Sequence, residues 1–148
     1  MITLFEKFYK KGLHITYSAI VLDDKSKNLL LSTFIYPNPE FLYWKKFADH
    51  STICIGELPE HLKRYWLDEK ITLTATELGI SDKAVAVKVK GFFNISKNSD
   101  VTPEESKIQH ITLAINPFDG KPVDSNYITN WQPIIPLKLI GIIKEIEL

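Results

Sequence analysis

Three of the four histidines in this chain begin a His-x-Thr triplet, a spacing that can bring an imidazole and a hydroxyl to one reacting group. The triplets are His14-Ile15-Thr16, His50-Ser51-Thr52 and His110-Ile111-Thr112. On a β-strand the first and third residues of each triplet share a face. When two such strands face one cleft, their side chains can split a phosphodiester without a metal. One imidazole acts as the base, the other acts as the acid, and the hydroxyls stabilise the phosphate oxygens.

A weak internal repeat selects His50 and His110 as the pair that belongs together. After each one the sequence predicts a strand, a proline breaker, a short helical piece and two further strand segments. Apart from the breaker, these elements fall at about 50–55, 59–67, 71–77 and 83–93 in one unit, and at 108–115, 124–126, 132–135 and 137–146 in the other. A duplicated unit would place the two triplets on adjacent central strands as pseudo-symmetric partners. The alternative for each histidine is an exposed or locally bonded side chain on a threonine-rich strand.

His14 begins no equivalent unit, because a strand and a helix separate it from the next proline turn. It lies on a strand predicted at 13–22, whose core face we expect to carry Tyr17. His14 and Thr16 would then point away from the core. His61, in the predicted helical piece at 59–67, is best explained as a surface residue.

The remaining segments complete one α+β domain spanning 1–148. A helix is predicted at 25–34 after the capping residue Asp23 or Asp24, with Leu29, Leu30 and Phe34 as its apolar stripe. We expect a turn at 79–82, an exposed loop at 94–106, and either a short helix or an irregular arm at 1–11.

Alternation predicts the two faces of the strands at 83–93 and 108–115. On the second strand Ile111, Leu113 and Ile115 should face the core, opposite His110. On the first, Lys88 and Lys90 alternate with valines. These lysines either line the cleft near phosphates or form a solvated strand face.

Composition argues against a metal, a cofactor and several partner classes. The single cysteine, Cys54, excludes a disulfide or multi-cysteine zinc site within the chain and fits a reducing cytoplasm. Neither triplet supplies a carboxylate, and Asp49 has the opposite strand parity to His50. Because Arg64 is the only arginine, phosphate would be held by hydroxyls, imidazoles, lysines or backbone amides. A net charge of zero gives no reason to expect duplex DNA as a partner, and no leader or membrane-length apolar run is visible.

The paired motif resembles that of the 2H phosphoesterases, in which two His-x-Thr or His-x-Ser motifs lie on paired strands of a duplicated α+β domain. The stretches at 17–24, 44–56 and 121–131 also resemble one branch, which contains tRNA-ligase-like phosphodiesterases and phage anti-CBASS proteins. The resemblance covers roughly 17–146. It implies a duplicated two-lobed 2H-phosphoesterase-like fold, with antiparallel central sheets and flanking short helices around a cleft. It also implies His50, Thr52, His110 and Thr112 as the catalytic residues, without a cofactor.

The anti-CBASS relatives cleave cyclic di- and trinucleotide messengers, and they hold the bases with a tyrosine on the first strand and a tryptophan near the second half. Tyr17 and Trp131 stand at the matching places, so the resemblance assigns them to substrate binding. Each is equally compatible with a core or rim aromatic. The family also has an acidic residue shortly before this tryptophan, whereas Asp124 lies nearby at a different spacing.

The function expected from these observations is metal-independent cleavage of 3′-5′ phosphodiester bonds in cyclic oligonucleotide signals, in the cytoplasm of a bacterial or phage-infected cell. Two related activities on RNA ends stay open, namely a 2′,3′-cyclic phosphodiesterase and a 2′-5′ RNA-ligase-like enzyme. A non-catalytic protein that sequesters a nucleotide messenger is a candidate of another class. A β-rich module in which the histidines are incidental is the third, and the oligomeric state stays open.

Overall fold

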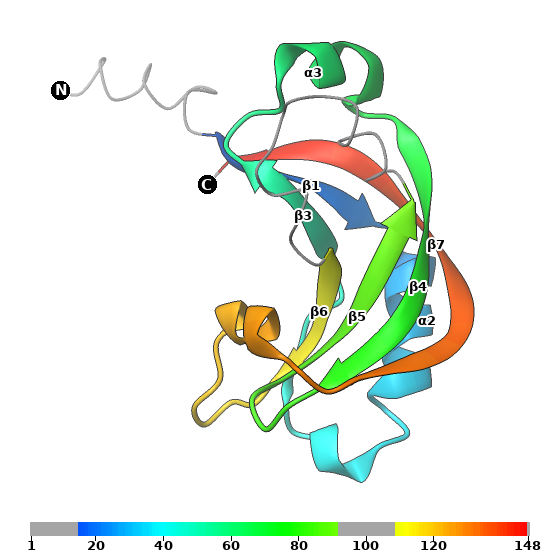
Figure 1. Ribbon diagram of the computed structural model, residues 1–148, viewed down its shortest axis with the longest axis vertical. Helices are drawn as coiled ribbons and strands as arrows, with labels where there is room; N and C mark the ends of the chain where they lie inside the picture. The colour runs from blue at the N-terminus through cyan, green and yellow to red at the C-terminus, as the bar shows by residue number, and fades with distance from the viewer. Residues whose placement is uncertain (1–14, 92–108, 148) are drawn as a thin grey trace, which may run out of the picture.

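The computed structural model describes residues 15–91 and 109–147, and within them it shows an α+β fold built on one seven-stranded antiparallel sheet (Figure 1). The strands are β1 (Ile15–Leu22), β2 (Lys45–Lys46), β3 (His50–Ile55), β4 (Lys70–Ile80), β5 (Ala84–Gly91), β6 (His110–Ile115) and β7 (Trp131–Glu147). The helical segments are α2 (Asp24–Phe34), α3 (Glu60–Trp66) and the 3-10 turns η1 (Pro39–Phe41) and η4 (Pro122–Tyr127). The predictions for His14, for the arm at 1–11 and for the loop at 94–106 lie outside the described residues.

The sheet is curled so that its two edges approach each other. Its strand order is β2-β6-β5-β4-β7-β1-β3, which puts β2 at one edge and β3 at the other. Only three residues separate these two strands in the chain. A chain that advances at most about 3.6 Å per residue spans no more than ~14 Å over the four steps from Lys46 to His50. The connection therefore brings the edge strand β3 close to the β2–β6 edge, and β3 contacts β6 directly.

Helix α2 covers one face of the sheet and confirms the helix predicted at 25–34. Asp23 caps its N-terminus by accepting a hydrogen bond from the Ser26 amide at 2.8 Å. Leu30 and Leu31 are buried in the same apolar cluster as strand residues such as Leu139, and in Figure 1 the helix lies behind the sheet. The predicted stripe was wrong in one position, because Leu29 is exposed and Leu31 takes its place in the core.

Bulges change the predicted faces of two strands. Ile111 and Leu113 lie in the main core as predicted, but the pairing of β6 with β5 shifts between Val85 and Ala86. Ile115 therefore turns to the opposite face, where it packs in a smaller cluster with Ala84, Ala86 and Ile128. On β1 the core residues are Ile20 and Leu22, whereas Tyr17 lies outside the main cluster, so the prediction that it shares the core face was wrong.

Three other predictions about element boundaries and neighbours were wrong. Gly79 is not in a turn but inside β4, where it pairs with Trp131. The segments predicted at 132–135 and 137–146 form the single strand β7, which runs through two prolines because its pairing with β4 is irregular there. Strands β3 and β6 are not adjacent central strands, since β3 lies at one edge of the sheet and β6 second from the other.

The two described parts of the chain contain no helix that combines the length and apolar character needed to cross a bilayer.

Candidate active site

The site forms where the chain leaves one edge of the sheet and joins the other. Residues Lys45 and Lys46 pair with Ile115 and Ala114 on β6, and the next two amides donate to the carbonyls of Leu113 and Thr112. The chain then changes direction at Ala48, whose φ of +67° lies in the left-handed region, and β3 continues by pairing with β1. β3 begins at His50, two residues after this kink, and it contacts β6, which begins at His110. In Figure 1 the starts of β3 and β6 lie next to each other.

The kink at Ala48 is held from several sides. A non-glycine residue in the left-handed region costs about 1–2 kcal/mol. The Ala48 amide donates to the carbonyl of Thr112 at 2.8 Å, and the carbonyl of the next residue, Asp49, accepts from the Leu22 amide at 2.9 Å. The Ala48 methyl group is fully buried. These contacts fix the direction in which β3 starts, and therefore where His50 points.

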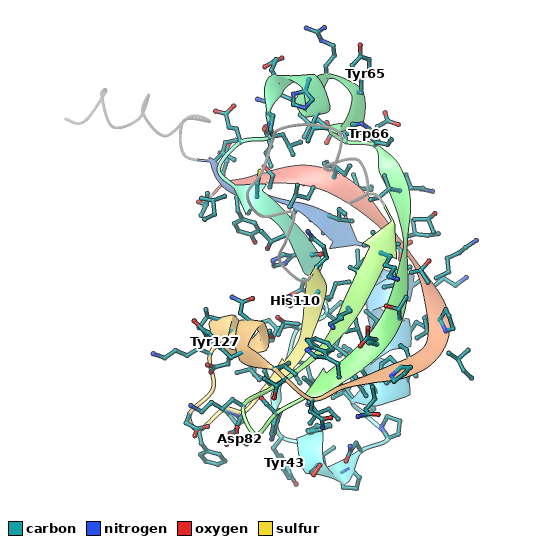
Figure 2. The ribbon with its side chains drawn as sticks, in the orientation of Figure 1. Tyr43, Tyr65, Trp66, Asp82, His110 and Tyr127 are labelled. Carbon is teal, nitrogen blue, oxygen red and sulfur yellow. The ribbon has the colours of Figure 1, made fainter. Side chains whose placement is uncertain are left out.

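A cleft of about 840 Å³ opens between β3, β6 and η4, within the usual range for small-molecule sites. The four residues predicted to be catalytic, His50, Thr52, His110 and Thr112, all line it. The two triplets begin sixty positions apart in the sequence, so the sheet topology, not local structure, brings them together. Figure 2 shows His110 on the open side of the curled sheet, between β3 and η4.

The two residues predicted to bind substrate lie at different parts of the cleft. Trp131 lines it directly. Tyr17 is not part of the lining, but its ring centroid is 5.2 Å from that of His50 with the planes tilted by 34°. Tyr17 therefore packs beside one of the candidate catalytic histidines.

Burial lowers the pKa of His50 below its ordinary value of 6.5, and the negative charge of Asp49 partly opposes this shift. Asp49 was expected on the opposite face from His50, and its carboxylate does point to α2, although the residue also borders the cleft at the kink before β3. Its carboxylate lies 2.7 Å from the Lys27 ammonium on α2. Burial therefore favours the neutral imidazole of His50, the form that a general base requires.

The two threonines differ in their surroundings. Thr52 is exposed at the cleft, and none of the described residues forms a side-chain hydrogen bond with it. The Oγ1 of Thr112 lies 2.8 Å from the Oγ of Ser125, a buried residue of η4. The sequence analysis did not identify Ser125. Its turn was predicted, but a serine in a turn gives no periodic signal to mark it.

The Trp131 ring packs over small residues on the neighbouring strands. Pairing places Trp131, Gly79, Ala86 and Thr112 in one row across β7, β4, β5 and β6. A Cβ atom on Gly79 would lie only 2.6 Å from two carbons of the indole ring, so the ring lies directly against the glycine. The indole Nε1 donates to the Ile128 carbonyl at 3.0 Å. The row without bulky side chains leaves the ring free to extend toward the cleft.

Neither of the two lysines considered for the cleft lines it: Lys88 lies against Trp131, which does, and Lys90 is exposed. Lys88 pairs with His110 in the β5–β6 ladder, and the two side chains share a face. The Lys88 ammonium lies 4.7 Å from the centroid of the Trp131 ring and 3.6 Å from a carboxylate oxygen of Glu77. Glu77 thus partly balances the charge that Lys88 places beside the Trp131 ring.

Apolar residues that the sequence analysis did not single out surround the cleft. Ile55, Val123 and Tyr127 line it and are largely exposed, with 84% of Ile55 and 72% of Tyr127 accessible. Figure 2 shows Tyr127 on η4 beside the cleft. Such a rim suits a ligand with flat apolar faces.

Residues 15–91 and 109–147 contain no group of three or more histidine, cysteine, aspartate or glutamate side chains arranged to hold a metal ion. No protein-family model matches the sequence, and a search of curated proteins finds no match. Any inference about function therefore rests on the site itself.

Proposed function

We propose that the protein is a metal-independent phosphodiesterase that uses His50 and His110 as an acid–base pair. The observation that carries this proposal is that two His-x-Thr strands, sixty residues apart in the sequence, line one cleft. Two imidazoles and two hydroxyls supply a base, an acid and two donors for phosphate oxygens, which is a complete set for splitting a phosphodiester.

His50 is assigned as the base because burial lowers its pKa and keeps it neutral. When the substrate carries a 2′-hydroxyl, His50 takes its proton while the 2′-oxygen forms a bond to phosphorus. The bond between phosphorus and the 5′-oxygen breaks, and His110 protonates that oxygen. The products are a 2′,3′-cyclic phosphate and a 5′-hydroxyl. Thr52 and Thr112 donate to the non-bridging oxygens, where negative charge grows.

The substrate we propose is a cyclic di- or trinucleotide signal. Trp131 lines the cleft, Tyr17 packs beside His50, and stacking of a base on an aromatic side chain contributes about 1–3 kcal/mol. The apolar rim with Tyr127 adds further flat surface, and the resemblance to the anti-CBASS branch points to the same substrate. The single cysteine and these substrates are consistent with a cytoplasmic site of action.

We also propose that the domain is a duplicated, two-lobed 2H-type fold. The order β6-β5-β4-β7-β1-β3 supports this, because it reads the same from either end when β3 is matched to β6, β1 to β5 and β7 to β4. The two repeated units along the chain are then β1-β3-β4 and β5-β6-β7. In each unit the His-x-Thr strand, β3 or β6, is followed by a helical segment, α3 or η4, and then by the last strand of the unit. Under this scheme β5 corresponds to β1, which differs from the repeat predicted from sequence.

The test is incubation with a panel of cyclic di- and trinucleotides and RNA fragments with 2′,3′-cyclic ends, with products identified by mass spectrometry. Cleavage of a cyclic oligonucleotide by the wild-type protein but not by the H50A/H110A double variant supports the proposal. Selective opening of 2′,3′-cyclic ends moves the function to RNA processing. If calorimetry shows tight binding and the ligand is recovered intact afterwards, the protein sequesters the nucleotide and does not cleave it.

A further inference from the structure

Ser125 is a buried side chain whose hydroxyl, within the described residues, contacts a candidate catalytic group and no other polar group. It is 2% exposed, and its Oγ lies 2.8 Å from the Thr112 Oγ1. It lies in η4, the turn that forms one wall of the cleft. A buried hydroxyl is almost always hydrogen-bonded, so this contact determines how both hydroxyl groups are oriented.

The direction of the Ser125–Thr112 hydrogen bond follows from counting hydrogens. Two hydroxyls have two hydrogens, and their mutual bond uses one. If Thr112 donated, the remaining hydrogen would be on Ser125, which is buried and has no other acceptor among the described side chains and carbonyls. A buried donor without an acceptor costs about 1–3 kcal/mol. Both residues line the cleft, but Ser125 is 2% exposed whereas Thr112 is partly exposed there, so Ser125 donates and the remaining hydrogen is on Thr112.

We propose that Ser125 is a positioning residue that fixes the Thr112 hydroxyl as a donor to the reacting phosphate, an inference that rests on the phosphodiesterase function proposed above. A hydroxyl that accepts one hydrogen bond is a stronger donor in the next. Thr112 thus has its hydrogen directed into the cleft before substrate binds, whereas Thr52 is exposed and has no such partner within the described residues. The two threonines are unequal: Thr112 stabilises the transition state more strongly.

The experiment compares the S125A, T112V and S125A/T112V variants by steady-state kinetics on a substrate that the wild-type protein cleaves. Removing one preorganised donor lowers kcat by about 10²–10³-fold, so T112V should fall in this range. S125A should lower kcat by roughly tenfold with little change in KM, because the donor remains but loses its fixed direction. In the T112V background, S125A should have no further effect on kcat.

The matched control is S51A. Ser51 is 1% exposed, and its Oγ has no hydrogen-bond partner among the described residues. It faces away from the cleft, so S51A should leave kcat unchanged. Urea unfolding of every variant shows whether it is folded at the assay temperature.

Equal effects of S125A with and without the Thr112 hydroxyl would assign Ser125 a purely structural role and overturn the inference, and so would unchanged kcat in S125A. Both results leave the proposed function intact, because wild-type turnover and its loss in H50A are measured in the same series. Absence of wild-type turnover on every substrate would instead overturn the proposed function and this inference with it.

Discussion

Gly79 lies beneath the Trp131 ring, and replacing it with alanine tests how the candidate base platform is built. A Cβ atom there would lie 2.6 Å from two ring carbons and 2.8 Å from a methyl group of Ile128. Carbon atoms pack at about 3.5–4.0 Å, so the ring must move by roughly 1 Å. That movement would stretch the 3.0 Å hydrogen bond from the indole Nε1 to the Ile128 carbonyl beyond bonding distance.

The expected cost of G79A combines two terms. Overpacking costs about 1–3 kcal/mol and the lost hydrogen bond about 0.5–1.5 kcal/mol, while replacing a strand glycine with alanine returns about 0.5–1 kcal/mol. G79A should therefore destabilise the protein by roughly 1–3 kcal/mol in urea unfolding followed by circular dichroism. It should also weaken nucleotide binding, because the displaced ring no longer extends toward the cleft.

The control is the same substitution in a W131A background. Without the indole ring the two closest contacts disappear, and only the 2.8 Å contact with the Ile128 methyl group remains to oppose the gain from replacing a strand glycine. G79A should then destabilise the protein clearly less than it does in the wild type. An equal loss of stability in both backgrounds would show that the ring does not rest on Gly79 and would refute this account of the row beneath it.

Three further predictions concern the histidine and the threonines. NMR titration should give His50 a pKa below 6.5, and a raised pKa would contradict its burial. The free energy of unfolding should also fall as the pH drops below 6.5, because His50 then binds a proton more readily in the unfolded chain than in the folded one. K27M should raise the pKa of His50 in the same titration, because the Asp49 carboxylate loses its 2.7 Å partner and its negative charge then acts more strongly on His50. An unchanged pKa would show that the charge of Asp49 does not influence His50. T112V should lower kcat more than T52V, and the reverse order would contradict the proposed inequality of the two hydroxyls.

The sequence predicted the local features that depend on neighbouring residues. Alternation placed Ile111 and Leu113 in the core and His110 on the other face, and the cap at Asp23 correctly marked the start of α2. Ile115 could not be placed, because a bulge depends on pairing with β5 and leaves no mark in the alternation. Gly79 was assigned to a turn because glycine commonly ends strands, whereas here its role is close contact with Trp131.

The arrangement of the site depends on tertiary structure that periodicity does not encode. The predicted triplets do line one cleft, but not as adjacent central strands, because the left-handed conformation at Ala48 sends β3 to the opposite edge of the sheet. No single residue near Ala48 signals that turn, since alanine rarely adopts a positive φ. Ser125 was missed for a similar reason, because only the packing of η4 against β6 brings it to the cleft.

The most direct test of the central claim is turnover of a cyclic oligonucleotide in excess EDTA by the wild-type, H50A, H110A and H61A proteins. His61 is exposed on α3, away from the cleft residues, so H61A is the matched control for removing an imidazole. The account predicts that the wild type and H61A retain full activity in EDTA, and that H50A and H110A each lose at least ~10²-fold. Full activity in H50A/H110A, or loss of wild-type activity in EDTA, would contradict it.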